Sequence, residues 1–204
     1  MALLPGHRAP TAIRLFLPRH RPCCEAADTV KCPVFKSLDT LFRMSDVWKP
    51  SVTVAAVIER KGQFLLVEEE TSDGIRFNQP AGHLDPGESL AQAVVRETME
   101  ETAHDFTPQG LIGMYMARYL SSRTRQEVTY LRFAFFGEAG NSYDRPLDVG
   151  ILRAVWMSYD ELLACKEKHR SDLVLRCIDD YRAGQRSPLS TIFTHPSVLG
   201  EPSA

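Results

Sequence analysis

Two neighbouring segments that begin just after residue 50 consist of apolar runs separated by a short polar break. VTVAAVIE at 52–59 is rich in β-branched residues, and QFLLVEE at 63–69 continues the pattern after a Lys-Gly pair at 61–62. Two such runs joined by a two-residue turn are typical of a β-hairpin. A shorter run at 75–79, closed by Pro80, predicts a third strand.

A helical period follows these strands. Ser89 and Gln92 stand at the spacing of a capping box, which predicts a helix over 90–102. Further strands are predicted at 111–120, 127–136 and 151–158, and further helices at 159–166 and 172–183. Ser171 is the expected cap of the last helix, and Gly184 is its expected stop.

The order of these elements indicates the fold class. Strands come first, a helix follows, and strands and helices then return in blocks rather than in strict alternation. This order favours an α+β fold, or an α/β/α sandwich, over a strictly alternating parallel sheet. We expect the folded domain at residues 45–190 and a C-terminal tail at 191–204.

The N-terminal part of the chain has a different character. Residues 1–44 show no sustained period and are interrupted by prolines, so we expect a disordered extension, with Met44 as an alternative start of the folded protein. Neither a membrane span nor a secretory signal is indicated by the apolar runs. Cys23, Cys24 and Cys32 match no standard zinc spacing, which favours unpaired thiols in a cytoplasmic protein.

The composition is that of an ordinary soluble protein. The 204 residues are 44% hydrophobic and 25% charged, which suits one domain with extensions. Residues 1–43 carry a net charge of +4 and the remainder carries −6. The formal net charge of −2 favours no partner among nucleic acids or membrane surfaces.

Three carboxylates crowd one side of the helix predicted at 90–102. Glu97, Glu100 and Glu101 stand at i, i+3 and i+4, where each like-charge pair costs roughly 0.2–0.5 kcal/mol. On a helical wheel they flank the face that we expect to pack on the sheet, which consists of Ala91, Val94, Val95, Thr98 and Thr102. One explanation is that clusters of glutamates often occur on solvated helix faces. The alternative explanation is that the three carboxylates bind a hard cation such as Mg²⁺.

The loop before this helix favours the explanation that the glutamates bind a cation. Gly82 and Gly87 permit backbone conformations that other residues avoid, and the Asp-Pro-Gly-Glu run at 85–88 forms a tight turn into the capped helix. From Gly82 onward the chain has a glycine, five residues, a glutamate, seven residues and Arg-Glu-x-x-Glu-Glu. This spacing is that of the Nudix box.

The chain therefore resembles the Nudix hydrolases over roughly residues 50 to 185. The phrases FNQPAGHLDPGES, WMSYDEL and YRAGQRSPL are similar to those of the NudJ-type Nudix phosphatases. Ala103 and His104 depart from the glycine and hydrophobic residue that close the box, a departure that affects the end of the helix more than the carboxylates.

The resemblance implies a Nudix α/β/α sandwich with a mixed β-sheet and a catalytic loop-helix. It implies that Mg²⁺, for which Mn²⁺ can substitute, is held by Glu97, Glu100, Glu101 and the backbone carbonyl of Gly82. Glu88 and Arg96 would form the ion pair that anchors the loop on the helix. The metal would neutralise the diphosphate and activate a water for attack on phosphorus.

Other side chains complete the site that the resemblance implies. Glu100 is the first candidate for the general base, and Glu127, at the start of a predicted strand, is the second. Arg123 and Arg125 are candidates for contact with substrate phosphates, although arginines in such loops more often serve solubility.

These residues favour an enzyme, a Mg²⁺-dependent phosphatase or pyrophosphohydrolase. The substrates that the resemblance implies are small diphosphates, namely hydroxymethylpyrimidine diphosphate, thiamine diphosphate and nucleoside di- or triphosphates. One alternative is a pyrophosphohydrolase that removes unwanted nucleoside triphosphates, and another is a nucleotide-sensing Nudix module without activity. A module of the latter kind is expected to lose metal-binding glutamates, and all three are present here. A monomer or a homodimer, without nucleic-acid or membrane partners, is expected.

Overall fold

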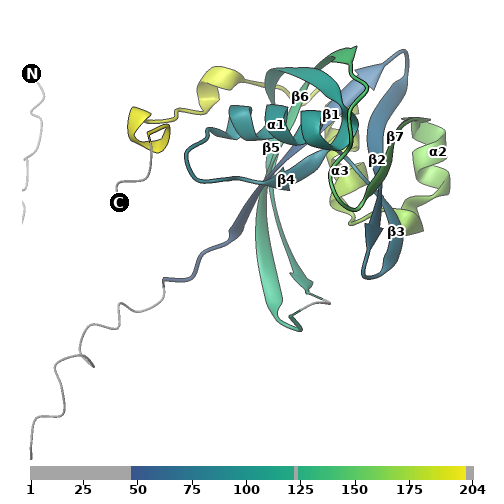
Figure 1. Ribbon diagram of the computed structural model, residues 1–204, viewed down its shortest axis with the longest axis horizontal. Coiled ribbons are helices and arrows are strands. Elements are labelled where there is room, and N and C mark those ends of the chain that lie inside the picture. Colours follow the sequence, from purple (N-terminus) through teal and green to yellow (C-terminus); the bar gives the residue numbers. More distant parts are fainter. Residues whose placement is uncertain (1–46, 122–123, 201–204) are drawn as a thin grey trace, which may run out of the picture. The chain divides into compact units, whose positions relative to one another are not determined.

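The computed structural model describes residues 47–121 and 124–200, and the predicted extension lies outside them. The strands are β1 (Ser51–Arg60), β2 (Gln63–Thr71), β3 (Gly74–Asn78), β4 (Ala81–His83), β5 (His104–Leu120), β6 (Glu127–Ser142), β7 (Ile151–Ser158) and β8 (Ser187–Pro188). The helices are α1 (Leu90–Thr102), α2 (Tyr159–Ala164) and α3 (Leu173–Arg182), with 3₁₀ turns at Lys166–Lys168, Leu189–Thr191 and Pro196–Val198. Figure 1 shows these elements along the chain.

The strands in the described part of the chain form one mixed sheet. Its order is β3-β2-β1-β6-β5-β8, with β4 paired to β1 and β7 paired to β2. β1 and β6 run parallel, whereas β1–β2 and β5–β6 are antiparallel pairs. The predicted hairpin is confirmed, since Lys61 and Gly62 both have positive φ in the turn that joins β1 to β2.

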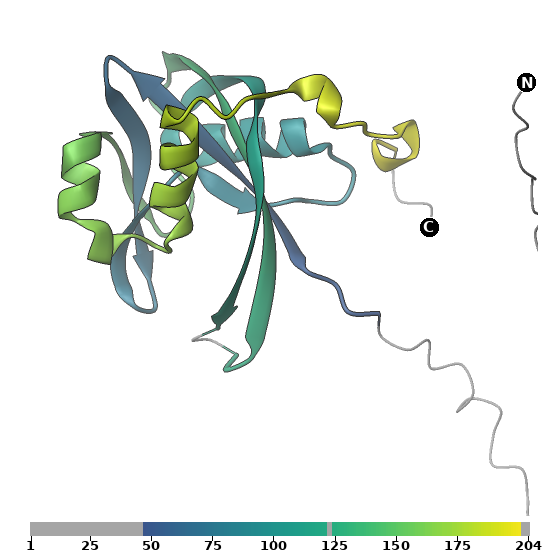
Figure 2. The ribbon, with the colours of Figure 1, turned by 180° about the vertical axis from the view of Figure 1, so that it is seen from behind.

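Alternate residues of β1 supply two separate cores, one on each face of the sheet. Val54, Ala56 and Ile58 lie in the cluster that packs against α1. Val57 lies instead in the cluster that includes residues of α2 and α3. Figure 1 shows α1 in front of the strands, and Figure 2 shows α2 and α3 from the other side. Because successive side chains of a strand point to opposite faces, this arrangement confirms the predicted α+β sandwich.

The buried face of α1 differs from the one predicted on the helical wheel. Ala93 and Glu97 are buried, with 0% and 8% of their surfaces exposed, whereas Val95 is 36% exposed. The face that meets the sheet is therefore rotated towards Glu97 and Glu101, which lie within the contact, whereas the Glu100 side chain is 31% exposed. The cause is a hydrogen bond, because the backbone N–H of Ala81 in β4 donates to the Glu101 side chain of α1.

Strands β5 and β6 are longer than predicted. β5 begins at His104 rather than at 111, and β6 continues to Ser142. Pro108 and Gly110 interrupted the sequence pattern, and the structure accommodates them with a register shift in the β5–β6 ladder. The short β4 was not predicted, because its three residues belong to the loop-like phrase after Pro80.

The prediction for α3 is confirmed at the C-terminal end of the helix and wrong at the N-terminal end. Gly184 ends the helix as expected, with φ of 81°, and its N–H donates to the Tyr181 carbonyl at 3.0 Å. The predicted Ser171 cap is wrong, because Asp172 is the N-cap residue and no side chain caps this end. None of the helices in residues 47–121 and 124–200 is long and apolar enough to cross a membrane.

The cap of α1 generates a stability prediction. Ser89 Oγ accepts the backbone N–H of Gln92 at 3.2 Å, and the Gln92 side chain accepts the N–H of Ser89 at 2.8 Å. Ser89→Ala should lower the free energy of unfolding by about 1 kcal/mol, and Ser89→Gly by only a few tenths. Urea unfolding followed by circular dichroism measures both, and equal losses would contradict the role of the cap.

Candidate functional site

The loop between β4 and α1 is held by its own polar groups. Gly87 adopts φ of 92°, a left-handed conformation that favours glycine. Glu88 Oε1 accepts the backbone N–H of Asp85 at 2.8 Å, which closes the turn. The capping box of Ser89 then starts the helix. The loop therefore delivers Glu88 to the side of α1 in a defined position.

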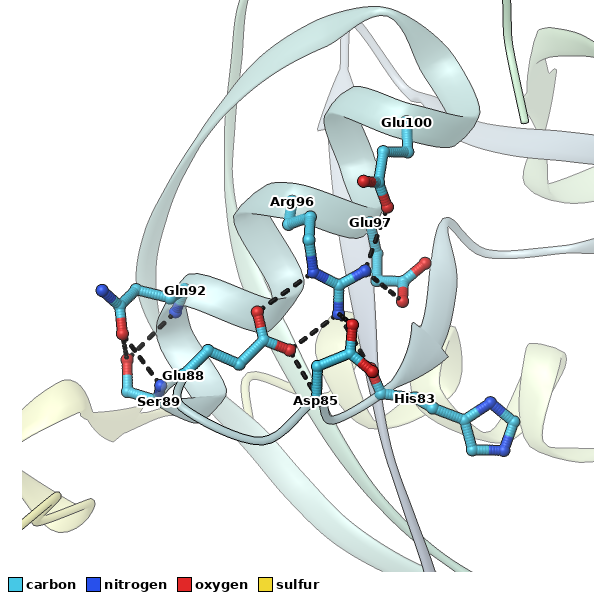
Figure 3. A network of polar contacts seen from close by, with 8 residues as sticks. All are labelled: His83, Asp85, Glu88, Ser89, Gln92, Arg96, Glu97 and Glu100. Atoms are coloured by element: carbon cyan, nitrogen blue, oxygen red, sulfur yellow. Dashed lines mark hydrogen bonds and ion pairs between the residues drawn. The ribbon is translucent and has the colours of Figure 1, made fainter. Parts of the chain in front are cut away.

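Arg96 of α1 joins the loop, β4 and the helix (Figure 3). Its Nε donates to Glu88 Oε2 at 3.0 Å, and its Nη2 donates to Glu88 Oε1 at 2.7 Å. Nη2 also donates to the His83 carbonyl at 2.9 Å. Nη1 donates to Glu97 Oε1 at 2.8 Å and to Glu100 Oε2 at 3.0 Å. One guanidinium thus holds three glutamates and a strand.

The expected ion pair between Glu88 and Arg96 is present in this geometry. Hydrogen bonding from Arg96 lowers the pKa of Glu88, and the same bonds raise the pKa of the guanidinium above its ordinary value. Because the Arg96 side chain is 28% exposed, removal of one partner should cost less than the ~3–5 kcal/mol of a fully buried pair.

Glu97 and Glu101 are carboxylates in poorly solvated positions. Burial raises the pKa of Glu97, and the hydrogen bond from Arg96 opposes the rise. Burial raises the pKa of Glu101 to about 8, although its Oε2 accepts the Ala81 N–H at 2.8 Å. The nearby charges of Glu97, Glu69 and Asp148 contribute to this rise of the Glu101 pKa. Negative charge is therefore concentrated on this part of α1 beyond what Arg96 neutralises.

Gly82 leaves room for this charge. A Cβ atom at position 82 would collide with the carboxylate of Glu97, so a larger residue there would displace that carboxylate from its place beside β4. The Glu97 carboxylate and the backbone of β4 are therefore adjacent.

The carboxylates of Glu97, Glu100 and Glu101 lie near one another, but they do not have the arrangement of a formed metal site. Within the described residues, no group of three or more His, Cys, Asp or Glu side chains has the geometry of a metal site. Arg96 and Ala81 explain this, because they take one oxygen each from Glu97, Glu100 and Glu101. The second oxygen of each carboxylate takes no part in these bonds. The donor set, all oxygen and beside a backbone, fits a hard divalent cation.

A cavity of about 980 Å³ adjoins these carboxylates at Ala81 and Gly82. Its lining comes from several strands and from the segment before α3, and it includes two cationic side chains, Arg132 and Arg170. A second hollow of about 540 Å³ lies along α1 and Pro108. Neither lining includes Glu97, Glu100 or Glu101, but of the two only the larger one includes residues of β4, whose backbone lies beside those carboxylates. The larger cavity is therefore the candidate substrate site.

The other predicted residues lie elsewhere. Glu127 is paired with Arg118 at 3.2 Å, and its side chain is 63% exposed. Arg125 is exposed, with φ of 57°, in the turn between β5 and β6. Neither is among the described residues that line the larger cavity. Arg123 lies outside the described residues.

Sequence reasoning missed several residues of the site. Asp148 lies near Glu97 and Glu101 and donates its backbone N–H to the Glu100 carbonyl at 3.0 Å. Arg132, in β6, donates to Gln79 Oε1 at 3.3 Å beside the cavity. Only Glu69 carried a usable signal, since the period of two places it on the same face as buried Val67.

Ala103 and His104, which differ from the usual end of the Nudix box, make contacts with nearby residues. Ala103, in place of the usual glycine, adopts φ of 56° and donates its N–H to the Met99 carbonyl at 3.0 Å. His104 Nδ1 lies 2.7 Å from the Thr102 carbonyl, and its ring makes an edge contact with Trp156. Ala103 is thus the C-cap residue of α1, and the helix ends at Thr102.

Comparison with known proteins places these features in a family. The sequence profile of the NUDIX domain matches residues 47–177. Phosphatase NudJ of Escherichia coli (strain K12) is 38% identical over 157 residues, which are 76% of this chain and 99% of that protein.

Solved structures agree with the sequence comparison. A NUDIX hydrolase from Nitrosomonas europaea is 49% identical, with a TM-score of 0.67 over 72% of this chain and 98% of its own. The NUDIX domain of Shewanella oneidensis NrtR, complexed with ADP ribose, is 18% identical, with a TM-score of 0.54 over 68% of this chain and 90% of its own. At that identity the second likeness concerns the fold alone.

The buried position of Glu101 predicts a pH dependence of stability. Its pKa rises from an ordinary 4.5 to about 8 in the folded chain, so the folded state holds a proton that the unfolded state has released. In protein treated with a chelator, the Glu101 contribution is therefore fully present below about pH 4.5 and is lost as the pH rises through about 8.

Glu101→Gln mimics the neutral carboxyl and should be more stable than the parent at pH 8.5, with the difference shrinking towards pH 5. Thermal unfolding in the presence of EDTA at several pH values measures this difference. A variant that is less stable than the parent at every pH would contradict the burial of this charge.

Proposed function

The chain belongs to the Nudix hydrolase family, so it is a hydrolase of phosphoric anhydride bonds, and we propose that it is a Mg²⁺-dependent phosphatase or pyrophosphohydrolase of small diphosphates. The proposed substrates are hydroxymethylpyrimidine diphosphate, thiamine diphosphate and nucleoside di- and triphosphates. The observation that carries the proposal is the position of Glu97 and Glu101 against the backbone of β4, with Glu100 held beside them by Arg96. The 38% identity to Phosphatase NudJ supports the phosphatase chemistry.

The proposed metal ligands are the oxygens of Glu97, Glu100 and Glu101 with the carbonyl of Gly82. Mg²⁺ commonly combines a few carboxylate oxygens with substrate phosphates, and Mn²⁺ can substitute for it. When bound, the cation would neutralise phosphate charge and make a coordinated water more acidic. Burial of Glu97 and Glu101 supports this role, because poorly solvated carboxylates gain most from a cation.

The remaining side chains position the reactants. Glu88 and Arg96 hold the loop and the helix together, so that the Gly82 carbonyl keeps its place beside the glutamates. Arg132 and Arg170 line the cavity and can neutralise part of a substrate's phosphate charge. Contact of substrate phosphates with Arg125, which is not among the described lining residues of the cavity, and with Arg123, which lies outside the described residues, is also proposed.

Glu100 is proposed as the general base. Its side chain is 31% exposed, so it is accessible to water, and it lies one helical turn from Glu97. Glu127 is the second candidate. Its exposed pairing with Arg118 at the far end of the hairpin gives Glu100 the stronger geometric support.

A substrate panel tests the proposal. The protein, with Mg²⁺, should release orthophosphate or pyrophosphate from at least one of the named substrates, and excess EDTA should abolish the release. Separate assays for the two products also distinguish the alternatives. Pyrophosphate from nucleoside triphosphates alone would indicate the enzyme that removes unwanted nucleotides. Binding of these compounds without any release, with Mg²⁺ or Mn²⁺, would indicate a sensing module and would overturn the proposal.

Substitution of the ligands tests the assignment of residues. Glu100→Gln and Glu101→Gln should each lower kcat roughly 100-fold or more, because they remove a ligand charge or the base while the side-chain volume is kept. Glu167→Gln, a matched change at an exposed residue, should leave kcat unchanged. Circular dichroism confirms that the variants are folded. Full activity in both glutamine variants would show that other residues hold the metal.

A further inference from the structure

The larger cavity has an aromatic region in its lining. His83 of β4, Tyr119 of β5 and Tyr130 of β6 all contribute to it. The ring centroids of His83 and Tyr130 lie 6.3 Å apart, and those of Tyr119 and Tyr130 also lie 6.3 Å apart. Clustered aromatic rings beside a cavity provide a surface on which a flat heteroaromatic ring can pack.

A second region of the lining comes from β2 and β3. Three consecutive glutamates of β2 have different surroundings, although their chemistry is the same. Glu68 Oε2 pairs with Arg153 Nε at 2.6 Å, and Glu70 is exposed. Glu69 lines the cavity, and its side chain is 18% exposed. The strand thus directs one carboxylate of the three into the candidate substrate site.

Asn78 of β3 accompanies Glu69. Val67 is the partner of Asn78 in the β2–β3 ladder, so Glu69 and Asn78 stand diagonally on the same face of the sheet. Asn78 is 7% exposed and also lines the cavity. Among the described residues, Glu69 Oε1 and Asn78 Oδ1 are the buried side-chain oxygens that lack a hydrogen-bond partner. Burial raises the pKa of Glu69, and hydrogen bonding from the Asn78 side chain opposes the rise, so the two side chains also contact each other. Buried acceptors of this kind are rare and call for a donor.

The charges nearby decide which kind of donor fits. Arg170 Nε lies 3.9 Å from Glu69 Oε1, too far for a hydrogen bond but close enough for attraction. Arg132 also acts on Glu69 electrostatically. Two guanidinium groups disfavour a metal cation at these oxygens, whereas they do not oppose an uncharged N–H donor. A primary amino group on a ring carries two such N–H bonds, one for each acceptor.

We propose that Glu69 and Asn78 select substrates whose organic part is a heteroaromatic ring with an amino group, by accepting the hydrogen bonds of that group. The ring would pack near His83 and Tyr130, while the phosphates extend towards Gly82 and the glutamates of α1. This assignment rests on the proposed diphosphate hydrolase activity and adds to it the residues that determine specificity.

The test compares matched substrates that differ at the amino group. The pairs are CTP with UTP, ATP with ITP, and hydroxymethylpyrimidine diphosphate, which has a ring amino group, with its oxo analogue. In at least one pair the full-length protein with Mg²⁺ should favour the amino member by about tenfold or more in kcat/KM, since unpaired polar groups penalise the analogue. The same protein provides both values, so the ratio does not depend on the fraction of active enzyme.

Two variants locate the source of the preference. Glu69→Gln, which replaces an acceptor oxygen by an amide donor, should lower the ratio to below about threefold, mainly through KM. Asn78→Ser should lower the ratio as well, because the shorter side chain takes the second acceptor oxygen out of reach of the amino group. Glu70→Gln is the matched control on the same strand, and its ratio should equal that of the parent.

The possible failures separate the two proposals. Absence of hydrolysis of every diphosphate would overturn the proposed function. Hydrolysis without an amino preference in any pair would overturn only the specificity assignment. A preference that survives in Glu69→Gln and Asn78→Ser, or an equal loss of kcat for both members of a pair, would show that these side chains do not read the amino group.

Discussion

The guanidinium of Arg96 is the point at which strand β4, the following loop and helix α1 are held together. It donates two hydrogen bonds to Glu88 and one to the carbonyl of His83, and its remaining nitrogen reaches Glu97 and Glu100. A lysine ammonium has no planar fork and could not make the paired bonds to one carboxylate while reaching the others. The position of the acidic residues against the sheet therefore depends on one side chain.

The same arrangement explains why α1 packs on the sheet with charged rather than wholly apolar residues. Ala93 and Val94 fill the core, and Glu97 and Glu101 continue the same buried face beside β4. Arg96 offsets part of their charge, and Gly82 gives the Glu97 carboxylate its space. A helix that served only as structure would place apolar side chains here. The retained charge is understandable if a cation completes the neutralisation during function.

The sequence was most informative where a local rule fixes the geometry. The capping box, the Lys-Gly hairpin and the spacing of the acidic residues each depend on neighbours in the chain, and the structure contains the first two as predicted. The buried face of α1 was misplaced because the wheel counts apolar residues, whereas a hydrogen bond from Ala81 to Glu101 draws the polar side inward. Glu69 and Arg132 were missed because the cavity joins strands that are distant in sequence.

The β5–β6 hairpin adds a consequence for how such a protein can diverge. In both views its far end extends beyond the helices, and Tyr119, Leu120 and Ser121 from this end line the cavity. Tyr119 and Leu120 are 39% and 63% exposed, so substitutions there disturb little of the core. The acidic cluster, by contrast, shares its contacts with the sheet. Mutational drift can therefore reshape one wall of the binding cavity while the hydrolytic apparatus stays under separate, stricter selection.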